Sequence, residues 1–333
     1  MVNFPAPVGG TPFPIDFAPS LTFAVLYGAL VPLMVYRMFN RRSRSILLLG
    51  TFLFSTERIV IFALRAVQSR NESHRLSPGL TTYMQISFAI GFIGIANNIV
   101  NLVRCLLVNA TYGPSTYGQS AAAASKGGLM EPPPLGTPDY PKARQWIRRG
   151  AWITSSSFIG AFVLGLVALS NYNKTFNDQQ QADTTDLLRF ISTVAALVLT
   201  TVLVKATVLG KYFLPRICNR AVLVTLTMTT LICIIAIYRL TVMGQRTTSL
   251  EMVGPLDTTG AKAAFYIFHV LPEWLAALVL FGGNTRQTFG AGMFGDYRLR
   301  DETEAQKQKR ETKEAEKAKQ RMLDMSQSDI TAI

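Results

Sequence analysis

Residues 17–36 read FAPSLTFAVLYGALVPLMVY, a stretch without a single acidic or basic side chain. Crossing a hydrocarbon core about 30 Å thick takes about 20 such residues in a helix, because backbone polar groups in lipid must bond to one another. Further segments of this kind follow at 45–67, 82–103, 151–170, 187–210, 221–241 and 263–282. The sequence therefore predicts an all-α membrane protein, a bundle of seven transmembrane helices.

The composition favours a membrane protein over a soluble one. Charged residues make up 16% of the 333 residues, whereas a soluble domain carries about 25%. The net charge of +13 is also typical of nucleic-acid-binding proteins, but here the Lys and Arg residues lie in short loops and a tail beside the apolar spans. We therefore expect contacts with membrane lipids and none with nucleic acid.

The basic residues of the loops predict the orientation. With the N-terminus (1–16) outside, the outer loops hold five of them: Arg70, Arg75, Lys174, Arg246 and Lys262. The inner loops then hold twelve: Arg37, Arg41, Arg42, Arg44, Lys126, Lys142, Arg144, Arg148, Arg149, Lys211, Arg216 and Arg220. Because cytoplasmic loops carry the excess of Lys and Arg, we expect an outer N-terminus, a membrane domain over 17–283 and a cytoplasmic tail over 284–333, with the plasma membrane as the location. Sequons at Asn71 and Asn173 would then face outward.

Two inner segments lack an apolar pattern. The loop over 109–146 contains alanines 121–124 and prolines 132–134, a low-complexity composition that predicts disorder. Residues 301–321 alternate acids and bases, with helix-supporting pairs such as Glu304 with Lys307 and Glu314 with Lys317. Such a helix has no apolar stripe with which to pack. We expect a solvated tail, open to anionic lipid or to a cytoplasmic partner.

Charged residues at mid-membrane depth are the main candidates for a functional site, because they are costly there. Glu57 and Arg58 lie near the middle of 45–67, and Glu273 lies near the middle of 263–282. His269 is one turn from Glu273 on the same face. The pattern predicts an ion-paired centre between these two helices. It is equally compatible with charges that only neutralise one another and fix the packing.

The segment 82–103 adds a polar stripe. Asn97, Asn101 and Arg104 follow the i, i+4, i+7 spacing of one helix face. Carboxamides in membrane helices bond to neighbouring helices, so the stripe predicts either helix packing or the lining of a polar cavity. Lys205 and Arg239 lie toward helix ends, where their long side chains are expected to reach the membrane surface.

Several seven-helix activities lack their chemistry in this chain. A retinal protein needs a lysine inside the last helix, and the only candidate, Lys262, lies at its mouth. A zinc hydrolase needs about three ligands around an open position, but the chain has two histidines, His74 and His269. No serine or cysteine has a plausible base beside it in the pattern. We expect no enzyme, no metal and no cofactor.

Short motifs in four helices resemble one family of fungal seven-helix proteins, the lipid-translocating exporter (RTA-like) family named for resistance to an aminocholesterol. They are Glu57 with Arg65, the run YMQ from 83 to 85 with Arg104, Tyr238 with Arg239, and the run YIFHVLP from 266 to 272. That family usually has an acid where this chain has His269. A histidine–proline–glycine pattern after the last helix is replaced by Gly282, Gly283 and Asn284.

This resemblance implies transport of, or a stress response to, lipids or amphipathic compounds. The chain has no Walker sequence, so the driving energy would come from gradients, lipid asymmetry or a partner. A receptor-like signalling protein is the alternative; the seven helices, the outer N-terminus and Arg104 at the inner end of its helix permit it, but Arg104 lacks an acidic neighbour. A scaffolding protein whose tail is the working part is a third interpretation.

Overall fold

The computed structural model describes residues 2–123, 130–214, 216–312, 315–316 and 319–320. Within them, seven helical segments are long and apolar enough to cross a membrane, which confirms the predicted fold class. These segments are Pro14–Phe39, Ile46–Arg70, Pro78–Ala110, Pro141–Ser170, Gln179–Phe213, Asn219–Val242 and Thr259–Gly282.

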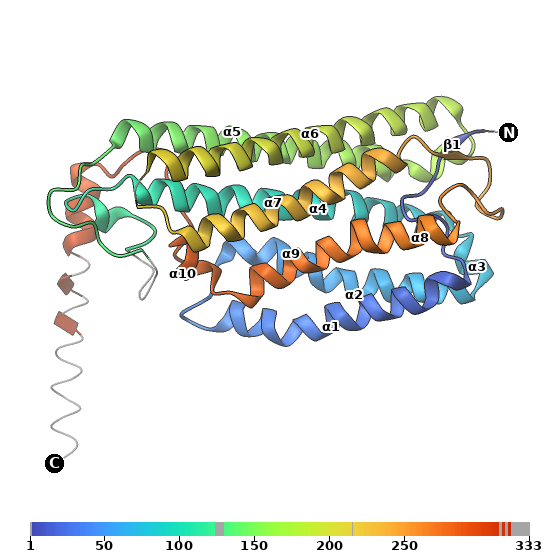
Figure 1. The fold of residues 1–333 in the computed structure, drawn as a ribbon, viewed down its shortest axis with the longest axis horizontal. Helices are drawn as coiled ribbons and strands as arrows, with labels where there is room; N and C mark the ends of the chain where they lie inside the picture. The colour runs from blue at the N-terminus through green and yellow to red at the C-terminus, as the bar shows by residue number, and fades with distance from the viewer. Residues whose placement is uncertain (1, 124–129, 215, 313–314, 317–318, 321–333) are drawn as a thin grey trace, which may run out of the picture.

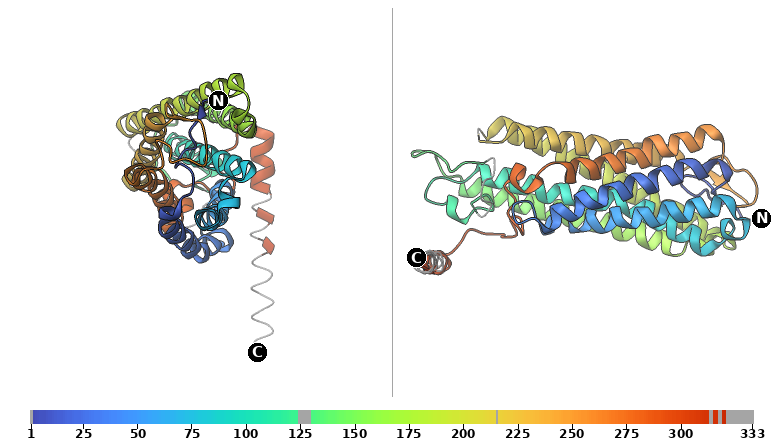
Figure 2. Two further views of the ribbon diagram at one scale, coloured as in Figure 1. Left: turned by 90° about the vertical axis from the view of Figure 1, so that its right-hand side faces the viewer. Right: turned by 90° about the horizontal axis from the view of Figure 1, so that it is seen from below.

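The long helices run side by side in one bundle, and the two ends of the chain lie at opposite ends of it (Figures 1 and 2). In chain order, the helices and strands are α1 Phe17–Phe39, α2 Leu49–Arg70, α3 Glu72–Arg75, α4 Pro78–Ala110, α5 Pro141–Ser170, α6 Gln179–Phe213, α7 Asn219–Val242, α8 Thr259–Phe265, α9 Leu271–Gly282 and α10 Thr285–Phe289, with strands β1 Phe4–Pro5 and β2 Arg246–Thr247. We call the end with α3 and β1 the N-terminal end and the end with α10 the tail end. Termini at opposite ends are what an odd number of crossings requires. Which end faces the cytoplasm stays a prediction.

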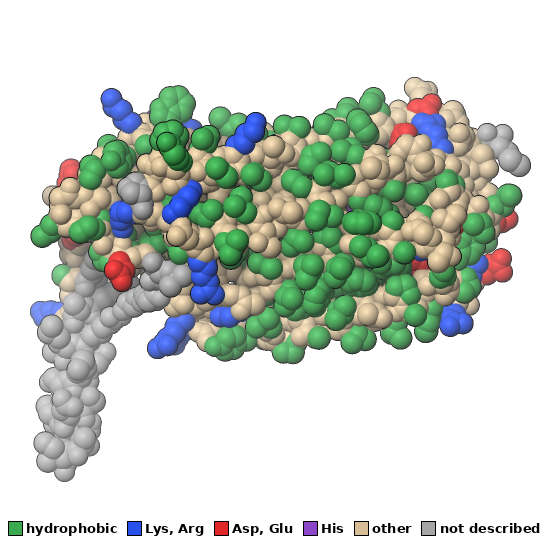
Figure 3. Space-filling view, in the orientation of Figure 1, with side chains coloured by type: hydrophobic (Ala, Val, Ile, Leu, Met, Phe, Trp, Pro, Cys, Tyr) green, Lys and Arg blue, Asp and Glu red, His purple; other side chains and the backbone are tan. Residues whose placement is uncertain are grey.

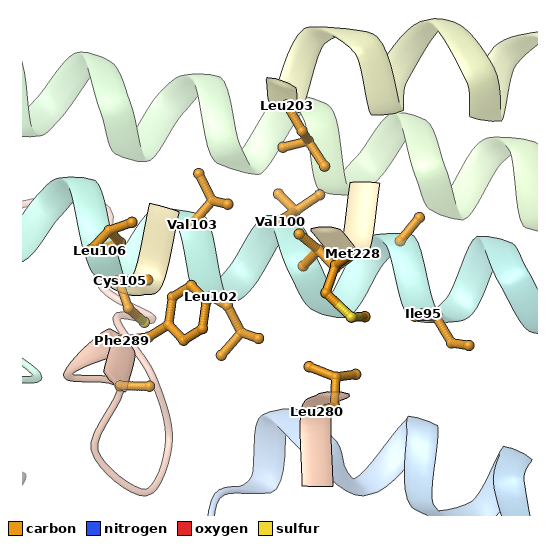
Figure 4. Close-up of a cluster of buried hydrophobic side chains, with 14 of the residues drawn as sticks. Ile95, Val100, Leu102, Val103, Cys105, Leu106, Leu203, Met228, Leu280 and Phe289 are labelled. Carbon is orange, nitrogen blue, oxygen red and sulfur yellow. The ribbon is translucent and has the colours of Figure 1, made fainter. Parts of the chain in front are cut away.

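Helix α4 is the centre of the bundle. In its most apolar stretch 67% of the residues are buried, against 28% in the stretches of α1 and α5. Its side chains Val100 and Val103 point toward Leu203 of α6, while Leu102 lies on the side of Leu280 of α9 (Figure 4). A helix with apolar residues all round is expected to be buried, and α4 is the helix that the others surround.

Several helices are longer than their apolar spans because polar residues cap them. Ser77 accepts a hydrogen bond from the backbone N–H of Leu80, and Pro78 occupies the first helical position, where its missing N–H costs nothing. Asp178 accepts from the N–H groups of Gln180 and Gln181. These caps start α4 and α6 before the hydrocarbon region begins.

The last membrane segment is two helices joined by one wide turn. Residues Tyr266–Val270 form a π-helical turn between α8 and α9. Pro272 follows this turn; proline has no N–H to donate, and its ring crowds the carbonyl four residues earlier. Such π turns are frequent at functional sites, and here the turn contains His269 and precedes Glu273.

The surface of the bundle is that of a membrane protein. Apolar side chains (green) cover its middle, and Lys and Arg (blue) gather toward the tail end (Figure 3). Exposed aromatic residues Trp146, Trp152, Tyr212 and Phe213 lie near the beginning of α5 and the end of α6. Tyr and Trp are enriched at the level of the lipid headgroups, so these residues indicate a membrane boundary there.

Two expectations about the inner segments are wrong in part. The loop over 109–146 is not disordered where it is described, because Tyr112, Tyr117 and Met130 are buried against the bundle. The tail packs at its beginning, where Asp301 forms ion pairs. From 304 to 312 the tail is helical and mostly exposed, as its alternating charges predict. Ala124, Lys126, Glu314 and Lys317 lie outside the described residues.

Candidate functional site

A buried ion pair joins α2 to α9 inside the bundle. The Nε of Arg58 donates to Oε2 of Glu273 at 2.7 Å, and its Nη2 donates to Oε1 at 3.0 Å. Neither side chain is exposed. Nη2 also donates to the carbonyl oxygen of Ser87 on α4, at 3.0 Å. The pair therefore links three helices, and its paired geometry holds the guanidinium plane in one orientation.

Glu57 lies on the other side of Ser87 and differs from Glu273 in its surroundings. Its Oε2 accepts a hydrogen bond from the Ser87 hydroxyl at 2.8 Å and lies 4.0 Å from Nη1 of Arg58. Its side chain is 30% exposed. Of the two carboxylates, Glu273 is thus enclosed by protein, whereas Glu57 is accessible from outside the core.

Glu57 is accessible through a groove between α2, α4 and α5, which we call the lateral groove. Its volume is about 630 Å³, within the range of about 300–1,000 Å³ common for ligand sites. The walls are mostly apolar, and among them Leu53 and Ile159 are more than half exposed on the face that meets lipid. The groove therefore opens sideways, toward the hydrocarbon region.

Two asparagines of α4 add polar groups to the wall of this groove. Asn97 accepts a hydrogen bond from Ser155 of α5 at 2.7 Å, and Asn98 donates to Thr51 of α2 at 2.6 Å. Both asparagines line the groove. Of the stripe predicted on α4, Asn97 therefore has both expected roles, because it bonds to a neighbouring helix and lines a cavity; Asn98 beside it does the same.

Asn101 and Arg104 do not belong to this centre. Asn101 donates to the carbonyl oxygen of Asn97 on its own helix, at 3.2 Å. Arg104 lies at the tail end, where Nε donates to Asp296 at 3.1 Å and Nη2 to the carbonyl oxygen of Arg298 at 2.6 Å. The regular spacing along α4 places Asn101 and Arg104 on one helix face. That face extends along the helix from the membrane interior to the tail end, so residues on it need not lie in one site.

His269 is buried in an aromatic cage and takes no part in the ion pair. Its ring stacks on Phe265, with centroids 5.4 Å apart, and meets the edge of Phe88 at 5.7 Å. Neither ring nitrogen has a hydrogen-bond partner among the described residues. The prediction that His269 and Glu273 share a face is consistent with both being fully buried, yet only Glu273 meets Arg58.

Arg239 is a central residue that the sequence analysis misplaced. The expectation that its side chain reaches the membrane surface is wrong, because it is 2% exposed and donates to the carbonyl oxygen of Phe88 at 3.0 Å. Arg239 is thus a second buried base in this part of the bundle, but among the described residues it forms no ion pair with Glu57 or Glu273.

The N-terminal end of the bundle is closed by residues that precede α1. Phe4, Ala6 and Val8 are buried, and the backbone of Val8 forms two hydrogen bonds with the side chain of Gln85, at 2.8 and 3.2 Å. The buried carboxylate of Asp16 accepts from Arg65 and pairs with Lys262, each at 2.9 Å. No motif marks residues 2–16, so sequence reasoning had no signal for this closure beyond the charge of Asp16.

The tail end is closed by a second ion-pair network. Asp296 pairs with Arg104 and Arg148, at 3.1 and 3.0 Å. Asp301 pairs with Arg148 at 2.7 Å and with Arg144. Burial would raise the pKa of the Asp301 carboxyl, but hydrogen bonds from Arg144 and Arg148 outweigh it and hold that pKa below its usual value.

The described residues offer no metal-binding cluster of three or more His, Cys, Asp or Glu side chains. Comparisons with family models, with curated proteins and with solved structures found no match to this chain. The lateral groove, with an accessible carboxylate beside a buried ion pair, is therefore the arrangement on which a functional proposal can rest.

Proposed function

We propose that this membrane protein binds lipids or amphipathic compounds from within the bilayer, as a step in their transport or in the response to them. The observation that carries the proposal is the lateral groove. It combines apolar walls, an opening toward lipid and one accessible carboxylate, that of Glu57. A molecule with an apolar body and a polar head matches all three features.

The depth of Glu57 supports this proposal. A carboxylate near mid-membrane is costly unless it is paired or lies in a polar cavity. Arg58 is already held by two hydrogen bonds to Glu273, so Glu57 keeps only the longer 4.0 Å contact with that guanidinium. An amine or hydroxyl group of a ligand in the groove would donate to Glu57 and satisfy it. The head would lie against Glu57 and the apolar body along Ile90 and Phe158, which line the same groove.

Two closed ends favour lateral entry over a path along the bundle axis. Asp16, Arg65 and Lys262 seal the N-terminal end, and Asp296, Arg104 and Arg148 seal the tail end. The groove, in contrast, meets the lipid-facing surface directly. The resemblance of the motifs at Glu57, Arg65 and 266–272 to lipid-translocating exporters agrees with this route.

The test uses the full-length protein in phosphatidylcholine nanodiscs and dodecylamine carrying an NBD fluorophore as the probe. Gly94 lines the groove, and a Cβ added there would meet no atom within 4 Å, so a side chain has room to begin there and Gly94→Leu is expected to occupy the groove. Gly28→Leu on α1 is the matched control, because its Cβ position is equally free and outside the groove.

We expect Gly94→Leu to abolish probe binding and Gly28→Leu to leave it unchanged. Glu57→Gln should weaken binding roughly 10- to 100-fold, the effect of losing one hydrogen bond to a charged group. Equal binding by wild type and Gly94→Leu would overturn the proposal. In proteoliposomes, quenching of the fluorophore by external dithionite then separates transport of the probe from binding alone.

A further inference from the structure

A second groove lies between α4, α5 and α6 at the tail end, on the other side of α4 from Glu57. Its volume is about 390 Å³. Val100 and Leu107 of α4, Ile147 and Ala151 of α5, and Leu203 and Ala206 of α6 form its walls. Val100 and Leu203 also belong to the buried core, where Figure 4 shows them pointing toward one another. The groove is distinct from the one in the proposed function, because the two share no lining residue.

This second groove also opens toward lipid, at the level of the headgroups. Val202, Leu209 and Phe213 of α6 line it and are exposed. Trp146 of α5 is three residues after Ala143 and four before Gly150, which both line the groove, so it lies on the same helix face. An exposed tryptophan in this position indicates the membrane–water boundary. A lipid that enters here would have its chain in hydrocarbon and its head at the surface.

Three lysines lie on the two helices, α5 and α6, that form the outer part of the groove. Lys205 is three residues after Val202 and four before Leu209, so it shares the face of two lining residues. It lies eight residues before the end of α6 at Phe213, roughly 12 Å inside that end, within reach of a headgroup for a side chain that extends toward the surface. Lys142 in the first turn of α5 and Lys211 in the last turn of α6 lie at the same end of the bundle as the groove.

These lysines have no acidic partner in the described part of the chain. All three are exposed, and no described carboxylate forms an ion pair with any of them. This differs from Arg104, Arg144 and Arg148 close by, whose charges are neutralised by Asp296 and Asp301. The tail-end parts of α5 and α6 therefore carry unbalanced positive charge near an apolar groove.

We propose that this second groove is a binding site for an anionic phospholipid. One acyl chain lies between α5 and α6 against Val100 and Leu203, and the phosphate lies at the mouth with Lys205, Lys142 and Lys211. Apolar walls alone would accept any lipid. The lysines select the anionic class, because a phosphate without a compensating positive headgroup gains from them and a zwitterionic head gains less.

The experiment measures retained lipid by native mass spectrometry. The full-length protein in neutral detergent is mixed with equal amounts of phosphatidylglycerol and phosphatidylcholine that carry the same acyl chains. Two variants probe the two parts of the site. Gly150→Leu fills the groove, since a Cβ there meets no atom within 4 Å, and Gly160→Leu on the same helix is its control. Lys205→Gln removes one charge, and Lys174→Gln at the N-terminal end is its control.

We expect the wild type and both controls to retain phosphatidylglycerol in preference to phosphatidylcholine. Gly150→Leu should lose the retained lipid, and Lys205→Gln should reduce the preference about fivefold, the effect of one basic residue near an anionic headgroup. Equal retention of the two lipids by the wild type would overturn the proposal. So would unchanged retention in Gly150→Leu, which would mean that the lipid binds only to surface charge.

Discussion

Arg58 and Glu273 lie 215 positions apart in the chain and meet through two hydrogen bonds of 2.7 and 3.0 Å, with both side chains fully buried. Glu57, the immediate neighbour of Arg58, lies on the opposite side of Ser87 and is 30% exposed. Two carboxylates near one guanidinium thus have different environments. We infer that Glu273 stabilises the bundle and that Glu57 meets the ligand.

Replacing Arg58 with alanine should destabilise the protein by about 3–5 kcal/mol, because Glu273 is then buried without its base. The double variant Arg58→Met with Glu273→Leu removes both charges and should recover most of this loss. Thermal unfolding of the purified protein in detergent measures both. A double variant as unstable as Arg58→Ala would show that the ion pair is not the cause.

Gly91 and Gly94, one turn apart on α4, should respond differently to the same change. A Cβ at Gly91 would overlap the ring of Phe54 and lie 2.6 Å from Nη2 of Arg58, whereas one at Gly94 meets nothing within 4 Å. Overpacking of a core costs typically about 1–3 kcal/mol. We therefore expect Gly91→Ala to lower the unfolding temperature and Gly94→Ala to leave it equal or higher. Similar effects at the two positions would contradict the packing of α2 on α4 described above.

The network at the tail end predicts a specific pH dependence. Burial would raise the pKa values of Asp139 and Asp301, but hydrogen bonds, chiefly from Arg144, hold both below the usual 3.8. A lowered folded-state pKa gives stability that is present above the unfolded value and is lost as pH falls through the folded value.

Asp301→Asn should therefore lower the free energy of unfolding by about 1 kcal/mol, a size expected for a partly exposed pair. This difference from wild type should stay constant from pH 7 to pH 5 and vanish only below pH 3.8. Denaturant unfolding across this range measures it. A difference that disappears between pH 7 and pH 5 would mean that a group other than Asp301 controls the network.

The orientation of the bundle is a separate prediction. The excess of Lys and Arg in the loops at the tail end predicts a cytoplasmic C-terminus and an external N-terminus. Reporters fused at each terminus, with protease protection as the readout, test this directly. Both termini on one side would contradict the seven crossings, and exchanged sides would contradict the charge rule.

Much of the fold follows from the sequence, because a membrane helix satisfies its own backbone and its span is local information. The functional sites can be predicted from the sequence less completely. Glu57, Arg58 and Glu273 could be singled out from depth alone, but which acid meets Arg58 depends on how α2, α4 and α9 pack. The partner of Arg104 is Asp296, 192 positions away, and no periodicity connects them. Residues 4–12 contain no span or motif, so their buried position follows only from contacts such as Val8 with Gln85.

The most direct test of the central claim is an electron cryomicroscopy map of the full-length protein in nanodiscs made from lipids of its own membrane. The account predicts elongated density in the lateral groove, with its polar end within hydrogen-bonding distance of Glu57 and its body along Phe158. Gly94→Leu, prepared in the same way, should lose that density. A wild-type map in which Phe54, Ile90 and Phe158 close the groove, or in which the same density persists in Gly94→Leu, would contradict the account.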